Sequence, residues 1–379
     1  MNPQSCRFCN QSLVSFCDLG QSPLANSFLK KDQLQAEEKF YPLHAYICEK
    51  CLLVQLDEFE SPNKIFSDYA YFSSYSKTWL KHCQDYTNQI TSRFKIDSNK
   101  KVIEIASNDG YLLKYFKNKN IPVLGIEPSE NVANVAESSG IKTVKSFFNS
   151  KLAHKLAENG EQPDLIICNN VLAHVPSLND FVEGLKILLK PKGVITLEFP
   201  SLMKLIEQNQ FDTIYHEHFS YFSLLTAEKI FLHHRLALFD VDELDTHGGS
   251  LRIYVKHQEN SENHSNKNLS RVKLIEKNKG LDKLHFYHNF MQQVKEIKRK
   301  LHDLLYEKKR QGNSIVAYGA PAKGNTLLNF CEIGADLIEY TVDLNPQKQG
   351  SFLPGTHIPI LHPDKIKDTK PDYVLILPW

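Results

Sequence analysis

The sequence lacks several features that would place it in common classes of protein. No apolar run approaches the roughly 18–20 residues that span a bilayer, and the start, Met1–Arg7, does not resemble a secretory signal peptide. The formal net charge is only +1 and the pI about 7.6, so no strong field draws the chain to nucleic acid or membrane. We therefore expect a cytoplasmic protein that binds neither nucleic acid nor membrane and is a monomer or a weak homo-oligomer.

Enough apolar material is present for a full core. The chain has 379 residues, of which 41% are hydrophobic and 23% charged. A chain of this length and composition is expected to form two or three domains. The patterns below divide it into three, at residues 1–60, 61–260 and 261–379.

The eight cysteines are distributed unevenly. Cys6 and Cys9 form one C-x2-C pair, and Cys48 and Cys51 form a second pair after 38 intervening residues. In a chain without a secretory signal, two such pairs suit four thiolates around one tetrahedral zinc ion. Four cysteine ligands leave no open coordination position, so this zinc is expected to be structural and to hold residues 1–60 together. The alternative is a set of unrelated buried or redox cysteines.

Residues 61–260 alternate between short apolar runs and helix-like segments. The runs Val102–Ala106, Pro122–Glu127, Asp164–Asn170 and Gly193–Phe199 are strand candidates. This alternation predicts an α/β fold with a parallel sheet. Ligands of such sheets bind at the carboxyl ends of the strands, which is where polar residues gather in this sequence.

The first of these strand ends carries a possible cofactor loop. No full G-x-G-x-x-G is present, which disfavours a dinucleotide. The pattern Glu104-x-Ala106-x-Asn108-x-Gly110 instead resembles the E-x-G-x-G-x-G turn of class I S-adenosylmethionine (SAM)-dependent methyltransferases, with two of its three glycines replaced. Glu127, 17 residues after Gly110, would accept hydrogen bonds from ribose hydroxyls. The predicted cofactor residues are Glu104, Ala106, Ser107, Asn108, Gly110, Glu127 and Asn169. The alternative is an α/β domain that binds no ligand.

Residues 261–379 show a second nucleotide-type pattern. A polar linker, Gln258–Asn268, precedes a long charged helical pattern at about 280–311. The strand candidate Ser314–Tyr318 then leads into a Gly-rich turn and a helix, and Ile338–Asp343 is a second strand ending in an acid. This βαβ unit could place a lysine and backbone N–H groups against phosphates at a helix N-terminus. The alternative is a structural turn with a solvated lysine. The predicted contacts are Tyr318, Gly319, Lys323, Asn325 and Asp343.

The most unusual stretch is Tyr215–His218, with the sequence Tyr-His-Glu-His, inside the apolar and aromatic frame Phe211–Ser220. Four consecutive side chains there can donate, accept or relay protons. A solvated surface does not need aromatic flanks, and an ordinary core avoids two histidines and a carboxylate. The stretch is therefore a candidate for acid–base chemistry near neutral pH.

Taken together, the motifs resemble those of sugar C-methyltransferases that methylate C3 of nucleotide-linked 4-keto-deoxyhexoses. The similarity covers essentially all 379 residues. It rests on the two cysteine pairs and on Asp18–Gly20, Pro23–Asn26, Leu53–Leu56, Tyr71–Ser76, Ser107–Gly110, Tyr215–His218, Gly248–Arg252 and Tyr318–Gly324. The resemblance implies a class I, Rossmann-like methyltransferase domain between a small zinc-binding domain and a C-terminal Rossmann-like βαβ domain that holds the nucleotide sugar. SAM and structural zinc are the implied cofactors.

The resemblance also implies roles for individual residues. His218 is the candidate base for the C3 proton, and Tyr215 and Glu217 support the substrate and the protonation state. His174 and Tyr69 would serve the same pocket. The open alternatives are a core role for His174, packing for Tyr69, a non-catalytic role for His218, and exchanged roles for Tyr215 and His218. His216 is expected to be structural.

Two rival functions remain at this point. One is a SAM-dependent O- or N-methyltransferase of another small metabolite, and the other is a catalytically inactive zinc-ribbon binding protein. Relatives of the resembled family continue past the position of Trp379, so the sequence is expected to be truncated there. Thymidine is that family's commoner nucleoside, but nothing in this sequence specifies the base or the sugar.

Overall fold

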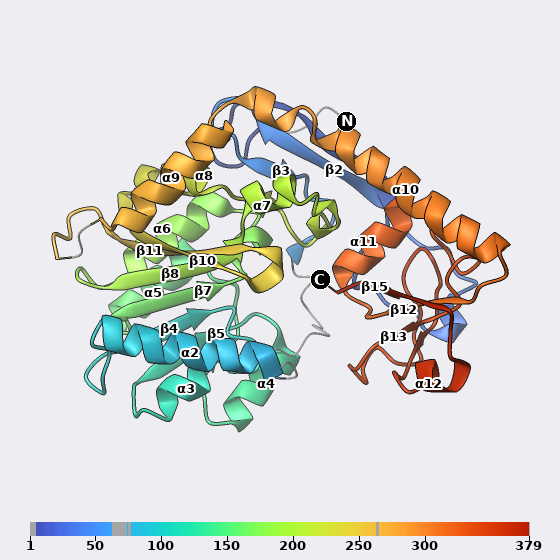
Figure 1. The fold of residues 1–379 in the computed structure, drawn as a ribbon. Helices are drawn as coiled ribbons and strands as arrows, with labels where there is room; N and C mark the ends of the chain where they lie inside the picture. Colours follow the sequence, from blue (N-terminus) through green and yellow to red (C-terminus); the bar gives the residue numbers. More distant parts are fainter. Residues whose placement is uncertain (1–4, 63–73, 75–76, 263–264, 379) are drawn as a thin grey trace.

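The computed structural model describes residues 5–62, 74, 77–262 and 265–378. The described strands form three sheets (Figure 1). The central sheet has seven strands in the order β10-β11-β8-β7-β4-β5-β6. Its strands are β4 (Val102–Ile105), β5 (Val123–Ile126), β6 (Thr143–Val144), β7 (Leu165–Asn169), β8 (Val194–Pro200), β10 (Leu236–Leu244) and β11 (Ser250–His257).

The central sheet confirms the α/β fold expected from the alternating runs. Strands β8, β7, β4, β5 and β6 are parallel, whereas β11 is antiparallel to both β8 and β10. The inner strands β4 and β7 are buried on both faces, which explains their continuous apolar sequences. The four strand candidates coincide with β4, β5, β7 and β8 to within two residues at either end.

Helices cover both faces of this sheet. One hydrophobic cluster holds side chains of α2 (Lys77–Arg93), α3 (Leu113–Lys117) and α4 (Glu130–Ser138). Another holds side chains of α5 (Ser150–Glu158), α6 (Leu178–Leu188), α8 (Leu224–His233) and α9 (Lys267–Lys279). Short 3₁₀ turns follow β7 and β10, at η3 (Leu172–His174) and η5 (Thr246–Gly248).

The N-terminal sheet is completed by a strand from the central part of the chain. Its order is β1-β2-β3-β9, formed by β1 (Leu13–Ser22), β2 (Tyr41–Cys48), β3 (Val54–Leu56) and β9 (Ser220–Tyr221), with the 3₁₀ turn η1 (Lys31–Gln33) between β1 and β2. Strand β9 begins two residues after His218 and pairs with β3. The stretch Tyr215–His218 is therefore fixed between the central part and the N-terminal sheet.

The C-terminal part contains a smaller parallel sheet, β14-β13-β12-β15. Its elements are η6 (Leu284–Tyr287), α10 (Phe290–Arg310), β12 (Ile315–Tyr318), α11 (Ala322–Phe330), β13 (Thr341–Val342), β14 (Ile360–Leu361), α12 (Lys365–Thr369) and β15 (Tyr373–Ile376). This arrangement confirms the predicted βαβ domain. The second predicted strand, at 338–343, is only two residues long.

The prediction of a helix over about 280–311 is wrong for the first ten residues of this range. Gly280, with φ +93°, ends α9 in the left-handed conformation, and α10 begins only at Phe290. Sequence reasoning also missed α9, because its first residues belong to the polar stretch that reads as a linker.

A shared core joins the first and last parts of the chain. Phe16 of β1 stacks on Phe290 of α10 with ring centroids 4.9 Å apart, and both belong to a cluster that includes β12 and α11. Figure 1 shows the long α10 running from the N-terminal sheet to the C-terminal sheet. The same cluster contains α7 (Leu202–Glu207) and η4 (Phe211–Thr213), which precede Tyr215. No helix in the described part of the chain is long and apolar enough to cross a bilayer.

Candidate active site

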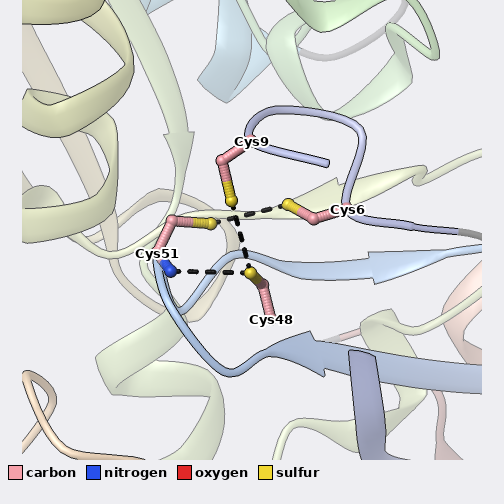
Figure 2. Close-up of side chains that lie close together, drawn as sticks. All are labelled: Cys6, Cys9, Cys48 and Cys51. Carbon is pink, nitrogen blue, oxygen red and sulfur yellow. Dashed lines mark hydrogen bonds between the residues drawn. The ribbon is translucent and has the colours of Figure 1, made fainter. Parts of the chain in front are cut away.

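The four paired cysteines converge as the sequence predicted. Figure 2 shows Cys6, Cys9, Cys48 and Cys51 pointing at one another, and their sulfurs all lie within 4.8 Å of one another. The Cys6–Cys51 and Cys9–Cys48 sulfurs are each 3.5 Å apart. Tetrahedral zinc with Zn–S bonds of about 2.3 Å requires sulfurs roughly 3.8 Å apart, so the four thiolates fit one zinc ion.

Local backbone geometry explains how the two pairs turn their sulfurs inward. The residue after the second cysteine of each pair has a left-handed conformation, Asn10 with φ 55° and Leu52 with φ 65°. Thr226 of α8 donates its hydroxyl to the Cys51 carbonyl at 3.3 Å. The zinc-binding turn is thus connected to the helix that follows Tyr215–His218.

The predicted cofactor residues lie together at the carboxyl ends of β7, β4 and β5, three neighbouring strands. Ala106, Asn108 and Gly110 have φ values of 58°, 49° and 78°. The backbone therefore keeps a left-handed conformation at all three glycine positions of the pattern, including the two where the side chain is not hydrogen. A Cβ on Gly110 would come within 2.6 Å of Ile141 Cδ1, so this last position has no room for a side chain.

Glu127 fixes the loop from the neighbouring strand. Its carboxylate accepts hydrogen bonds from the backbone N–H groups of Asn108 and Ser129, both at 2.9 Å. Burial raises its pKa, against these two hydrogen bonds. The Ser129 side chain also bonds to this carboxylate. A carboxylate has about four lone-pair sites, so capacity remains for a predicted ribose hydroxyl.

Buried polar atoms around this loop provide a test of the predicted cofactor. Within the described ranges, both amide atoms of Asn169 and Oδ1 of Asp109 are buried without a hydrogen-bond partner. Burial raises the pKa of Glu104 well above its usual value, and the neighbouring Asp109 and Glu127 raise it further. Unpaired amide groups and three clustered acids fit a ligand with hydroxyls and positive charge, as SAM has in its ribose, ammonium and sulfonium groups. Ser107 lies below the loop against Gly125, where a Cβ would approach its hydroxyl to 2.4 Å.

The hydrogen bonds of His218 define its tautomer. Its Nδ1 lies 3.0 Å from the Thr213 carbonyl oxygen, which can only accept, so Nδ1 carries the hydrogen. Its Nε2 then accepts from the Tyr215 hydroxyl at 2.8 Å. Burial lowers the pKa of His218 well below its usual value, and nearby His174 and Lys323 lower it further. His218 is consequently a neutral imidazole with a basic Nε2.

His174 lies beside this pair, as expected. Its Nδ1 donates to the Glu217 carbonyl at 2.7 Å, and its ring centroid is 4.7 Å from that of His218. Burial lowers its pKa to about 4. Two neutral imidazoles therefore share the site, each oriented by a main-chain carbonyl.

Glu217 and His216 point toward the N-terminal part. The Glu217 carboxylate accepts from Asn26 Nδ2 at 2.7 Å, and burial raises its pKa to about 7, with Lys348 acting in the opposite direction. His216 donates from Nε2 to the Pro42 carbonyl at 3.2 Å and lies edge-on to the Tyr41 ring. The backbone turns here, with the His218 N–H donating to the Tyr215 carbonyl at 2.9 Å, and the partners of His218 differ from those of both neighbours.

The predicted phosphate-binding turn lies close to His218. Helix α11 packs on η4, where Phe330 and Phe211 have ring centroids 5.3 Å apart. Lys323, in the first turn of α11, is attracted to Asp212 and lies near enough to His218 to lower its pKa. The C-terminal turn and the acid–base stretch therefore face a common space.

Other residues of this turn have structural tasks. Gly319 has φ 90°, and a Cβ there would meet Pro378 at 2.4 Å. Asp343 accepts from the backbone N–H groups of Ala320 and Asn345, both at 2.8 Å, so its carboxylate holds the turn. Tyr318 ends β12 and is partly exposed at this turn. Asn325 is 1% exposed, and in the described structure both of its amide atoms lack a hydrogen-bond partner.

Some residues of the site were not predicted from the sequence, and one predicted residue lies outside the part of the chain that the structure describes. Asn26 and Lys348 approach the predicted residues only through tertiary contacts. Asp109 lies between the predicted Asn108 and Gly110, and its effect on Glu104 became evident only from the folded loop. His247 directly precedes the Gly248–Arg252 motif and was passed over. Tyr69 falls outside the described residues.

Comparison with known proteins assigns each part of the chain. Residues 6–66 match a family model for a zinc-binding domain, residues 79–240 a methyltransferase domain, and residues 245–379 the C-methyltransferase C-terminal domain. C-methyltransferase NovU of Streptomyces niveus is 30% identical over 378 residues, which is 99% of this chain and 89% of NovU.

More distant matches cover less of the chain. The ubiquinone biosynthesis O-methyltransferase of Pasteurella multocida is 30% identical over 110 residues, 26% of this chain and 45% of that protein. The solved magnesium protoporphyrin IX methyltransferase ChlM of Synechocystis PCC 6803 with bound SAH is 14% identical, with a TM-score of 0.38 over 47% of this chain and 83% of its own. The full-length match to NovU and the three domain matches in order support one assignment. The chain is a SAM-dependent methyltransferase with a zinc-binding N-terminal domain, and it belongs to the C-methyltransferase family that includes NovU.

Proposed function

We propose that the enzyme transfers a methyl group from SAM to C3 of a nucleotide-linked 4-keto-6-deoxyhexose through an enolate, in deoxysugar biosynthesis. The observation that carries this proposal is the neutral His218, whose Nε2 accepts from the Tyr215 hydroxyl next to His174, the end of the turn that follows β7, and near Lys323. The domain boundaries at 60 and 260 remain predictions within this proposal.

The chemistry requires a base next to a donor. A ketone at C4 acidifies the hydrogen on C3, because the electron pair of the broken C–H bond can move through C4 onto the ketone oxygen. His218 takes the C3 proton on Nε2, the only ring nitrogen with a free lone pair in its tautomer. The C4 oxygen becomes an enolate, and its charge must be met by a hydrogen-bond donor.

Tyr215 is the donor in this proposal. Its hydroxyl occupies Nε2 of His218 until the substrate arrives, and it is partly exposed while His218 is buried. When C3 approaches Nε2, the hydroxyl is displaced by a short rotation and donates to the adjacent C4 oxygen. The 2.8 Å hydrogen bond thus holds the Tyr215 hydroxyl and His218 Nε2 next to each other, as the adjacent C4 oxygen and C3 of the substrate require.

Bound SAM would supply the electrophilic methyl group. C3 would take it as the C4 carbonyl re-forms, and the methyl–sulfur bond would break with its electron pair left on the sulfur of S-adenosylhomocysteine. The chain's own part in this step is positional. Glu104, Asp109 and Glu127 provide carboxyl groups whose raised pKa values at Glu104 and Glu127 fall again when a positively charged ligand binds, and Asn169 provides unpaired amide atoms, at the strand ends next to β8. Holding the reactants in line contributes much of the acceleration in such reactions.

His174 and Glu217 act indirectly. The His174 N–H holds the Glu217 carbonyl, and the Glu217 carboxyl is bound to Asn26 of the N-terminal part. We assign them to the orientation of the Tyr215–His218 pair. Tyr69 remains a candidate for the same pocket.

The nucleotide is assigned to the turn before α11. Lys323 supplies positive charge to the diphosphate, and the buried, unpaired amide of Asn325 supplies directed hydrogen bonds. Helix α11 also presents the free N–H groups of its first turn to the same side. Tyr318, Gly319 and Asp343 shape this turn, and Asp343 is the candidate for the ribose contact.

The experiment is incubation with methyl-labelled SAM and a panel of nucleotide 4-ketosugars, followed by NMR of the product. We expect the label on C3 of a nucleotide-linked 4-ketosugar. A methyl group on oxygen or nitrogen, or no transfer to any member of the panel, would contradict the proposed substrate class while leaving the family assignment intact.

A further inference from the structure

The turn η5 between β10 and β11 has an unusual backbone. His247 has φ 53° and ψ 35°, and Gly248 and Gly249 follow with φ 75° and 113°. Glycine accepts such values without cost, but a side chain in the left-handed region costs roughly 1–2 kcal/mol. Strained non-glycine residues concentrate at functional sites. The His247 side chain is therefore a candidate for a functional contact.

The turn is held firmly against the acid–base stretch. Gln210, directly before η4, donates its Nε2 to the Gly248 carbonyl at 2.8 Å, and the Ser201 N–H donates to the Gly249 carbonyl at 3.0 Å. A Cβ on Gly249 would come within 2.8 Å of the Lys204 side chain, so the turn packs closely on α7. The position of His247 is thus fixed relative to Tyr215–His218.

The His247 ring is accessible but surrounded. Its residue is exposed, and the ring centroid lies 5.7 Å from that of Trp79, which stacks on His82. Burial among neighbouring groups lowers the pKa of His247 to about 4, and Lys323 lowers it further, against Glu198. The His247 side chain is therefore open to solvent on one side and lies near the Trp79 ring on another.

Lys323 links the η5 turn to the reaction centre. Gln210, which holds the η5 turn, directly precedes η4, and α11 with Lys323 packs on η4 through Phe211 and Phe330. In keeping with this packing, the Lys323 ammonium lowers the pKa of both His247 and His218. Lys323 comes from α11 of the C-terminal part, so two domains place a cation and an imidazole beside one space. An anion bound there is stabilised by both groups and removes the repulsion between Lys323 and a protonated His247.

We propose that His247 is a substrate-binding residue that, together with Lys323, binds the diphosphate of the nucleotide sugar between η5 of the central part and α11 of the C-terminal part. This inference rests on the proposed function, since that function supplies the diphosphate. It assigns a task to the Gly248–Arg252 motif as well: the two glycines allow the turn that presents His247.

The test compares His247→Asn with His247→Asp. Asparagine and aspartate both tolerate the left-handed region and have nearly the same shape, so the two variants differ in charge at one position. The probe is thymidine diphosphate glucose, which carries the diphosphate but no 4-ketone and so cannot enolise. Its Kd is measured by calorimetry at 50 mM and 300 mM salt. His154→Asp, at an exposed position on α5, controls for added charge elsewhere.

We expect His247→Asp to bind the probe at least tenfold more weakly than His247→Asn, with the difference shrinking at high salt, and His154→Asp to bind like the wild type. Equal affinities of the two His247 variants would overturn the inference. The inference would also be overturned if the His247 variants bound the probe like the wild type but exchanged the C3 hydrogen of a 4-ketosugar more slowly. The ring would then act on the sugar and not on the diphosphate. If the wild type binds neither this probe nor the corresponding uridine, cytidine and guanosine diphosphate sugars, the proposed substrate class fails first.

His247→Gly separates binding from strain. Glycine removes the ring but accepts φ 53°, so this variant is expected to unfold at the same or a higher temperature than the wild type. Weaker binding of the probe in a variant of undiminished stability supports a ligand contact. Undiminished binding would mean that the ring is not used.

Discussion

The Tyr215 hydroxyl donates a 2.8 Å hydrogen bond to His218 Nε2, and the Thr213 carbonyl accepts from the opposite ring nitrogen at 3.0 Å. The two contacts allow only the His218 tautomer with hydrogen on Nδ1, and the lone pair on Nε2 then points at the Tyr215 phenol. A base held in this way is neutral, oriented and covered. In the proposed reaction, its lone pair becomes available only when the substrate displaces the phenol.

Replacing Tyr215 with phenylalanine should slow exchange of the C3 hydrogen in D2O by about 10²-fold, because the enolate loses one donor. The base remains, so exchange should still be measurable by NMR, and the affinity for thymidine diphosphate glucose should not change. Tyr306→Phe, at an exposed position on α10, is the matched control.

His218→Gln should reduce the same exchange by 10²-fold or more, since it removes the base itself, with estimates for general bases of about 10²–10⁴. If His218→Gln retained exchange and Tyr215→Phe abolished it, the two residues would have exchanged roles. Unchanged exchange in His218→Gln would remove it as the base.

The sequence predicted the elements that depend on local pattern. Buried parallel strands such as β4 and β7 are continuous apolar runs, and a C-x2-C pair brings its own turn, so both were recognisable. The position of Glu127 was also predictable, because this residue directly follows the apolar run that forms β5. Its two backbone hydrogen bonds were not, since they depend on how the loop at Asn108 closes.

Tertiary contacts explain most of what the sequence did not reveal. The strand β9 has only two residues and no periodicity, and it exists because β3 offers an edge. Lys348 reaches the region of Glu217 from more than a hundred residues away. The α9 helix begins in a polar stretch and has no strong apolar face, so the distribution of apolar residues in the sequence did not predict its packing on β10.

Replacing Ala106 with glycine should stabilise the protein. Ala106 has φ 58°, and removing its Cβ relieves about 1–2 kcal/mol of strain while adding about 0.5–1 kcal/mol of backbone entropy to the unfolded chain. The expected net gain is roughly 0.5–1 kcal/mol in the free energy of unfolding by urea. Ala157→Gly, within α5, should instead lose about 1 kcal/mol. A loss of stability in Ala106→Gly would show that the methyl group makes contacts that outweigh the strain.

Replacing Cys9 with serine should abolish the binding of one zinc ion per chain, measured by elemental mass spectrometry, and lower the melting temperature. We also expect slower C3 exchange, because the zinc-binding turn contacts α8 and its sheet pairs with β9 next to His218. Cys331→Ala removes a buried sulfur outside the cluster and should keep full zinc content. Full zinc occupancy in Cys9→Ser would contradict the four-cysteine site.

His174 should make the stability of the fold depend on pH in a defined window. Its pKa falls from 6.5 to about 4 on folding because burial disfavours the charged ring. A depressed pKa means that the folded state binds fewer protons, so the contribution is complete above pH 6.5 and is lost as the pH falls toward 4. Over the full window this amounts to about 3 kcal/mol. In His174→Gln, which keeps a donor for the Glu217 carbonyl, the deficit in unfolding free energy relative to the wild type should therefore be largest at pH 7 and should shrink by pH 4.5. Exposed His154→Gln should show no such change. A deficit for His174→Gln that is the same at both pH values would mean that the His174 ring is not held neutral by burial.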